Sequence, residues 1–283
     1  TLVEPNKKWS NLGIMHELDC AGLLFQAAVA HYLGTGKRTL LDVACRFADK
    51  IDSVFGPDKR PGMPGHEEIE LALVDLYRVT GEKRYLNLAQ FFIDQRGQKP
   101  SLFEKETFDP VTGGRVEANK SHFLVDGKYD GRYTQDHLPI REQSAVVGHA
   151  VRAMYLYSAM ADVVGETNEK ALRDALERLW QNVTLARMYV TGGIGPSSHN
   201  EGFTEDYHLP NTTAYAETCA AVGNIIWNWR MLMLDGKARF TDVMELALYN
   251  GFLSGLALDG KNYFYVNPLR SNGDKSRQGW FGC

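Results

Sequence analysis

Glu217 and Cys219 are a pair whose types and spacing could bind a metal ion such as zinc. Side chains at positions i and i+2 of a helix do not share a face. If both bind one ion, a helix must therefore begin at about Thr218, which is a good N-cap residue. Cys219 then lies in the first turn, where the helix N-terminus favours a thiolate. A buried cysteine beside a dipole-stabilising glutamate explains the spacing equally well.

Three acidic residues precede this pair, namely Glu201, Glu205 and Asp206. Hydrolysis of a glycosidic bond needs a protonated carboxylic acid near the leaving oxygen. Acidic loop residues usually do no more than face water, so spacing alone does not select among the three.

Four histidines lie where a cleft could use them: His16, His66, His137 and His149. We expect the first two at helix starts, the third just before a helix and the fourth inside an apolar stripe. In an α/α barrel the starts of alternate helices converge at one end, where histidines could donate hydrogen bonds to sugar hydroxyls. A capped or satisfied core histidine is the simpler interpretation of any single one. Three at comparable places in the repeat favour a site.

The four cysteines are far apart in the sequence, which makes a disulfide framework improbable in a chain of this length. A reduced, cytoplasmic setting is therefore predicted. His16 and Cys20 have metal-compatible spacing on one helix face. Without a second pair nearby, core packing is the better interpretation of Cys20.

Hydrophobic periodicity at i, i+3 and i+4 predicts about eight helices. They cover residues 14–33, 37–54, 66–80, 83–95, 139–163, 168–183, 218–234 and 238–256. A strand is expected at 262–267 and a short ribbon near 187–194. The long segments 96–138 and 184–217 break the pattern and, at that length, are usually functional.

A weak repeat joins successive helices. Thr35-Gly36-Lys37 recurs as Thr80-Gly81-Glu82, with looser copies at Gly165 and at Asp235-Gly236-Lys237. In each copy, glycine supplies the left-handed C-cap of one helix. Such repeated hairpins predict an all-α fold, an (α/α)6 barrel or toroid of helical hairpins with short β-ribbons in its loops. A closed toroid has twelve helices, so we expect residues 1–283 to form part of one catalytic domain whose barrel is incomplete here.

Composition excludes several classes of function. The 283 residues carry a net charge of −4 and no basic stripe, so nucleic acid is not an expected partner. No apolar run approaches the roughly 18 residues that cross a bilayer. A hydrophobic content of 44% is enough for a substantial core.

Taken together, the motifs resemble the β-L-arabinofuranosidases of glycoside hydrolase family 127. The resemblance is collinear over nearly the whole chain, and each motif is short, but the ordered set is specific. The matching stretches are Met15-His16-Glu17-Leu18, Gly65-His66-Glu67-Glu68, Gln135-Asp136-His137, Arg141-Glu142-Gln143, Gly148-His149-Ala150, Thr191-Gly192-Gly193-Ile194-Gly195, Tyr215-Ala216-Glu217-Thr218-Cys219 and Tyr265-Val266-Asn267-Pro268-Leu269.

This resemblance implies a retaining hydrolase that releases L-arabinofuranose from non-reducing β-linked ends, with a zinc-bound cysteine thiolate as nucleophile. It implies Glu201 as general acid/base and Glu217 and Cys219 as zinc ligands. It also implies four residues that hold the furanose: His16, His66, His149 and Tyr265. The expected partners are an arabinose-containing oligosaccharide or glycoconjugate and, in a homodimer, a second copy of the chain.

The end of the sequence departs from the family pattern. The family's nucleophile and last zinc ligand lie in a Cys-Cys-Pro-Pro-Asn-like motif, whereas this chain stops at Trp280-Phe281-Gly282-Cys283. Cys283 aligns just before that pair, so we expect the nucleophile just past it. Whether Cys283 itself is a ligand stays open, and residues 1–283 alone are expected to be inactive.

Two other interpretations compete with this one. Another α/α-barrel carbohydrate enzyme, such as an unsaturated-uronyl hydrolase or a sugar epimerase, needs no metal, so a zinc assay separates it. A non-catalytic sugar-binding fragment would bind sugar without turnover.

Overall fold

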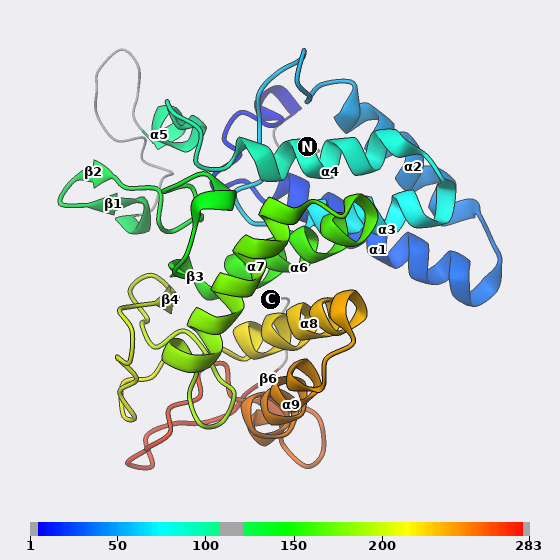
Figure 1. The fold of residues 1–283 in the computed structure, drawn as a ribbon. Helices are drawn as coiled ribbons and strands as arrows, with labels where there is room; N and C mark the ends of the chain where they lie inside the picture. The colour runs from blue at the N-terminus through cyan, green and yellow to red at the C-terminus, as the bar shows by residue number, and fades with distance from the viewer. Residues whose placement is uncertain (1–4, 108–120, 280–283) are drawn as a thin grey trace. The chain divides into compact units, whose positions relative to one another are not determined.

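The computed structural model describes residues 5–107 and 121–279, and helices dominate it (Figure 1). Its α-helices are α1 (Glu17–Thr35), α2 (Thr39–Asp52), α3 (Ile69–Thr80), α4 (Lys83–Gln95), α5 (Leu102–Thr107), α6 (Ala150–Thr167), α7 (Lys170–Asn182), α8 (Thr218–Asp235) and α9 (Ala238–Leu246). Three two-stranded antiparallel ribbons pair β1 (Leu124–Val125) with β2 (Lys128–Tyr129), β3 (Gly148–His149) with β4 (Gly202–Phe203), and β5 (Asn262–Tyr263) with β6 (Gln278–Gly279). The predicted all-α class with short ribbons in loops is confirmed.

The chain divides into two compact units. The first comprises Thr1–Glu142 and Asp162–Leu172, and the second comprises Gln143–Ala161 and Arg173–Cys283. The boundaries fall inside α6 and α7, so each of these helices contributes to both units. The assignment of residues 1–283 to one catalytic domain stays a prediction.

In the first unit, α1 packs on α2 and α3, and α3 packs on α4 (Figure 1). Helix α3 is the central element, because its residues Ile69–Val74 are all buried. Gly22 allows α1 to approach α3 closely, since a Cβ at this position would lie 2.8 Å from Ile69 Cα. Burying each large apolar side chain stabilises the fold by about 1.5–3 kcal/mol.

In the second unit, α8 packs on α9 and its inner face is aromatic. Trp227 is fully buried, with its ring 5.1 Å from that of Tyr157. Trp180 contacts Phe240 edge to face and donates a hydrogen bond of 2.8 Å to Asn228. These contacts fix the direction of α8, and therefore the place of its first turn.

The turns between hairpin helices share one hydrogen-bond pattern. The Thr35 hydroxyl donates to His31 O and accepts from Lys37 N, and the Thr80 hydroxyl does the same with Leu76 O and Glu82 N. Gly36, Gly81 and Gly236 are left-handed C-caps, as predicted. The prediction for Gly165 is wrong. Helix α6 continues to Thr167, whose hydroxyl makes the same two bonds, and Asn168 takes the left-handed position with φ of 56°.

Several predicted boundaries are also wrong. The helix expected over 139–163 begins at Ala150, because residues 140–142 form a short 3-10 turn and His149 belongs to β3. The helix expected from residue 66 begins at Ile69, since the φ of −174° at Glu68 is extended and lies outside the helical range. The strand expected over 262–267 is limited to Asn262–Tyr263, and the ribbon near 187–194 is a single bridge between Met188 and Ile194.

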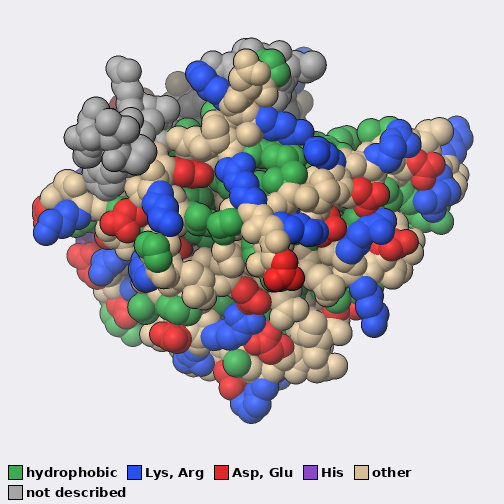
Figure 2. Space-filling view, turned by 90° about the horizontal axis from the view of Figure 1, so that it is seen from above, with side chains coloured by type: hydrophobic (Ala, Val, Ile, Leu, Met, Phe, Trp, Pro, Cys, Tyr) green, Lys and Arg blue, Asp and Glu red, His purple; other side chains and the backbone are tan. Residues whose placement is uncertain are grey.

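The surface carries mixed charges. On the face in Figure 2, Lys and Arg side chains are interspersed with Asp and Glu. Within residues 5–107 and 121–279, none of the helices combines the length and the apolar character that a membrane span requires.

Candidate active site

Glu217 and Cys219 lie at the start of α8, as expected if both side chains bind one ion. Helix α8 begins at Thr218, which places Glu217 at the N-cap and Cys219 in the first turn. The expectation that Thr218 is the N-cap is wrong by one residue, because its hydroxyl donates to Phe264 O at 2.5 Å instead. The Glu217 side chain makes no capping bond to the helix, so its carboxylate is available for another partner.

The Glu217 carboxylate is buried, with 4% of the residue exposed. Its Oε1 accepts a hydrogen bond of 2.6 Å from the Tyr265 hydroxyl, whereas its buried Oε2 accepts none from the described residues. Burial raises the pKa of this carboxyl, and the neighbouring Cys219 and Tyr265 side chains oppose the rise. A buried oxygen without a donor costs free energy, so this atom calls for a partner.

Tyr265 is held in place by the segment that follows β5. This segment runs beside the start of α8, where Thr218 N donates to Tyr265 O at 2.9 Å. Asn267 fastens the next turn, because its amide donates to Ala216 O at 2.9 Å and to Thr218 Oγ1 at 3.0 Å. Ala216 itself has a φ of 39°, in the left-handed region.

Glu201 and His149 are brought together by the ribbon of β3 and β4. His149 is paired with Gly202, and Ala150 N donates to Glu201 O at 3.1 Å. The side chains meet, with Nε2 of His149 3.4 Å from Oε2 of Glu201. A Cβ on Gly202 would lie 1.7 Å from Gly148 O, so the ribbon requires glycine there.

Geometry distinguishes Glu201 from the two other acids of its loop. Glu205 and Asp206 are exposed, and Asp206 accepts a hydrogen bond of 2.7 Å from Arg187, which lowers its pKa. The Glu201 side chain is 27% exposed, so it is held by His149 and still open to a ligand. Sequence spacing left these three acids equivalent.

Tyr215 belongs to the same cluster, although sequence reasoning assigned it no role. Its ring packs edge to face on that of Tyr265, with the centroids 6.2 Å apart. Burial raises the pKa of its hydroxyl, and the charges of Glu217 and Glu201 raise it further. The negative charges of both carboxylates therefore disfavour ionisation of the same Tyr215 hydroxyl. In the sequence, the signal for this role was an aromatic residue two positions before Glu217.

His16 and His66 lie together in the first unit, around an aspartate that the sequence did not single out. The two rings are 5.4 Å apart, and Asp19 Oδ2 lies 2.9 Å from His16 Nδ1 and 3.8 Å from His66 Nδ1. Asp19 is three residues after His16, a helical neighbour by spacing. His16 is at the N-cap of α1, as predicted.

Two further predictions concern residues near these groups. Cys20 is exposed, so its expected core packing is wrong. His137 is partly buried just before the 3-10 turn at 140–142, and burial, which outweighs the other influences, lowers its pKa to about 4. Within the described parts of the chain, the interactions of His137 involve none of the candidate site residues.

The start of α8 fits zinc in its donor chemistry. Carboxylate oxygen and cysteine sulfur are both zinc ligands, and structural and catalytic sites use three or four protein ligands. Glu217 offers an oxygen without a donor, and Cys219 offers sulfur. Within residues 5–107 and 121–279, no group of three or more His, Cys, Asp or Glu side chains is arranged to hold a metal. Cys283, the other candidate ligand, lies outside the described residues.

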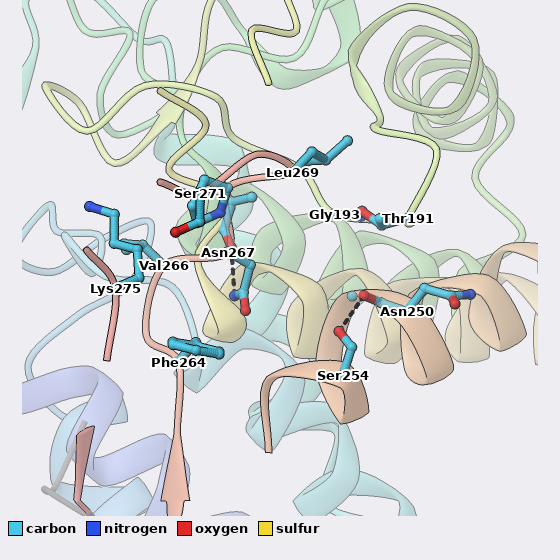
Figure 3. A pocket seen from close by; sticks show the side chains of 13 residues that line it. Thr191, Gly193, Asn250, Ser254, Phe264, Val266, Asn267, Leu269, Ser271 and Lys275 are labelled. Atoms are coloured by element: carbon cyan, nitrogen blue, oxygen red, sulfur yellow. Dashed lines mark hydrogen bonds between the residues drawn. The ribbon is translucent and has the colours of Figure 1, made fainter. Parts of the chain in front are cut away.

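A cavity of about 540 Å³ lies beside this turn in the second unit (Figure 3). Ala216 and Val266, which flank Glu217 and Tyr265 in sequence, line it. Figure 3 also shows Ser254 donating to Asn250 O at one wall. None of the candidate catalytic or ligand side chains lines the cavity, so volume alone does not locate the site.

The helical hairpins define an (α/α)-barrel class of protein. Distant solved structures share this fold, including a protein from Listeria innocua (TM-score 0.54, 17% identity) and the cellobiose 2-epimerase of Bacillus thermoamylovorans (TM-score 0.51, 14% identity). Comparison with families is more specific. The model of the β-L-arabinofuranosidase, GH127 catalytic domain matches residues 1–283, and the chain belongs to this family.

Individual relatives agree with this assignment. A non-reducing end β-L-arabinofuranosidase from Bifidobacterium longum subsp. longum is 42% identical over 95% of this chain and 42% of its own. A GH127 β-L-arabinofuranosidase from Geobacillus stearothermophilus T6 is 49% identical, with a TM-score of 0.91 over 99% of this chain and 45% of its own. The chain therefore spans less than half the length of these relatives.

Proposed function

We propose that this chain carries the acid/base residue and part of the metal site of a retaining β-L-arabinofuranosidase. The enzyme would release L-arabinofuranose from non-reducing β-linked ends of an oligosaccharide or glycoconjugate. The observation that carries this proposal is that the Glu201–His149 pair lies in one unit with the buried Glu217 and the half-buried Cys219. The activities in the names of the family and its relatives support it.

Glu201 is the proposed general acid/base. In the first half of a retaining reaction its protonated carboxyl gives a proton to the leaving oxygen, and in the second half its carboxylate takes one from water. The partial exposure of the side chain suits both steps, because substrate and water can reach it.

The resemblance assigns His16, His66, His149 and Tyr265 to the furanose. We propose that His16 and His66 in the first unit, and Tyr265 in the second, bind sugar hydroxyls of the substrate directly, whereas His149 acts through Glu201. Imidazole and phenol groups hydrogen-bond sugar hydroxyls, and each of these four side chains is oriented by a protein partner. Asp19 faces His16 and His66. Glu201 faces His149, and Glu217 accepts from Tyr265.

Glu217 and Cys219 are the proposed zinc ligands. When bound, zinc would act as a Lewis acid and keep the cysteine sulfur deprotonated at neutral pH. Glu217 Oε2 would take the metal, and Tyr265 would hold the other oxygen and so fix the carboxylate plane. For the attacking group, the resemblance points to a cysteine thiolate. Cys283, whose role as a ligand the sequence leaves open, lies outside the described residues.

Turnover of matched substrates by the full natural protein tests the proposal. We expect cleavage of an aryl β-L-arabinofuranoside with net retention at the anomeric carbon, followed by NMR, and no cleavage of the α-linked isomer. Inversion, or equal cleavage of both isomers, would contradict it. Metal-independent action on unsaturated uronides, or epimerisation of a free sugar, would favour another α/α-barrel carbohydrate enzyme. Sugar binding without turnover would favour a non-catalytic sugar-binding module. A cytoplasmic location and a homodimer stay predictions.

A further inference from the structure

His149 uses both of its ring nitrogens within the second unit. Its Nδ1 lies 3.1 Å from Val151 N and 3.4 Å from Arg152 N, and its Nε2 lies 3.4 Å from Glu201 Oε2. The side chain is 9% exposed, so water competes little for these positions. Backbone amides can only donate, so Nδ1 must be the acceptor.

An accepting Nδ1 decides where the ring carries its hydrogen. In neutral imidazole one nitrogen accepts and the other donates, so the hydrogen is on Nε2. Helix α6 begins at Ala150, which makes Val151 and Arg152 its second and third residues. Their amides have no acceptor within the helix. His149 therefore supplies the acceptor that Ser, Thr, Asp or Asn supplies at most helix starts.

We propose that His149 is a positioning residue for Glu201, fixed by the start of α6 as the Nε2–H tautomer. This assignment deepens the proposed function, on which its catalytic part rests. Because the hydrogen on Nε2 faces Oε2, 3.4 Å away, that oxygen stays an acceptor, and the transferable proton of the acid form is carried by Oε1. The Oε1–H bond breaks as the proton passes to the leaving oxygen. Oε1 takes a proton back when it acts as base on water.

The ribbon of β3 and β4 makes this arrangement rigid. His149 and Gly202 are partners in the ladder, and Ala150 N donates to the carbonyl of Glu201. The backbones of the two residues are therefore linked, while the helix start fixes the ring. Without this contact, the carboxylate of a loop glutamate could rotate, and either oxygen could carry the transferable proton.

Three substitutions separate the two contacts of the ring. His149→Asn places an acceptor near the position of Nδ1 but does not reach Glu201. His149→Gln places an amide donor near the position of Nε2 but is a poor cap. His149→Ala removes both. In the full natural protein, we expect Tm to fall by about 2–4 °C in the Gln and Ala variants, as for loss of an ordinary cap, and to stay near wild type in the Asn variant.

Activity on two substrates reports the second contact. A poor leaving group needs the proton of Glu201, whereas an activated aryl β-L-arabinofuranoside does not. We expect the ratio of kcat on the poor to kcat on the activated substrate to fall about tenfold or more in the Asn and Ala variants, and to recover in the Gln variant. An unchanged ratio in the Asn variant, or equal losses on both substrates, would overturn the positioning role. Melting of the Asn variant like the Ala variant would overturn the cap.

The tautomer can be measured without activity. NMR of the full protein labelled with ¹⁵N-histidine distinguishes a protonated ring nitrogen from an accepting one. We expect His149, assigned by its absence from the Asn variant, to carry hydrogen on Nε2 alone, and hydrogen on Nδ1 would overturn the inference. If the wild type cleaves no arabinofuranoside, the proposed function fails, while these spectra and the melting series still decide the tautomer and the cap.

Discussion

Gly22 sets how closely α1 approaches α3, and Gly22→Ala tests whether that approach keeps His16 and His66 together. A Cβ on Gly22 would lie 2.8 Å from Glu68 Cγ and from Ile69 N and Cα. Two of these atoms are backbone and cannot rotate away. The helices must then separate by about 0.6 Å to reach the 3.4 Å at which ordinary contacts begin. Overpacking of this kind costs about 1–3 kcal/mol.

Gly34→Ala is the matched control, because Gly34 lies in the same helix and has no atom within 4 Å of its Cβ position. Alanine is favoured over glycine in a helix by up to about 1 kcal/mol. That gain is common to both variants, so the difference between them isolates the packing cost. At about 2–4 °C per kcal/mol, Tm of Gly22→Ala should lie about 2–12 °C below that of Gly34→Ala.

Calorimetry gives the stability difference, and kinetics give the functional consequence. If the rings of His16 and His66, now 5.4 Å apart, hold one sugar, the separation should raise KM in Gly22→Ala and leave KM unchanged in Gly34→Ala. Equal Tm values for the two variants would refute the packing argument. A lower Tm with unchanged KM would refute the link between α1–α3 spacing and sugar binding.

Three further predictions concern protons and metal. Glu201→Gln should slow poor leaving groups about 10²–10⁴-fold and activated ones far less, whereas equal losses would assign Glu201 another task. The full protein should hold about one zinc per chain by elemental analysis, and Glu217→Ala should lower that content; zinc near zero in the wild type would contradict the site. Burial lowers the pKa of His137 to about 4, against about 6.5 when unfolded. The native state therefore loses stability as pH falls from about 6.5 to about 4. His137→Gln should flatten that part of the Tm–pH curve, and an unchanged curve would contradict the burial argument.

Local signals predicted the helices well, and tertiary contacts decided their ends. Period 3.6 and the Thr-Gly turns located the hairpins, because the turn chemistry involves only neighbouring residues. The start of α6 could not be found this way. Its apolar periodicity extends upstream of Ala150, but pairing with β4, distant in sequence, draws Gly148 and His149 into a ribbon. Gly165 is not the cap of α6, because Asn168, three residues later, takes the left-handed position and the Thr167 hydroxyl bonds the turn.

The candidate site divides in the same way. The spacing of Glu217 and Cys219 predicted a helix start between them, because only that local geometry lets both side chains serve one ion. Selection of Glu201 needed the β3–β4 pairing, which no spacing within its loop encodes. Asp19 and Tyr215 were missed because their roles depend on rings from elsewhere in the chain, His66 and Tyr265.

Two strained backbone positions connect the fold to the proposed chemistry. Glu201 has a φ of 49° and Ala216, just before Glu217, a φ of 39°, both in the left-handed region that non-glycine residues rarely occupy. Such positions cost of order 1–3 kcal/mol and persist only where neighbouring bonds over-determine them. Here Glu201 O accepts from Ala150 N, and Ala216 is fixed by Gly195 O and by the amide of Asn267. The strain therefore falls on the peptides that aim the proposed acid and the proposed metal ligand, and the ribbon and the start of α8 supply the bonds that hold them.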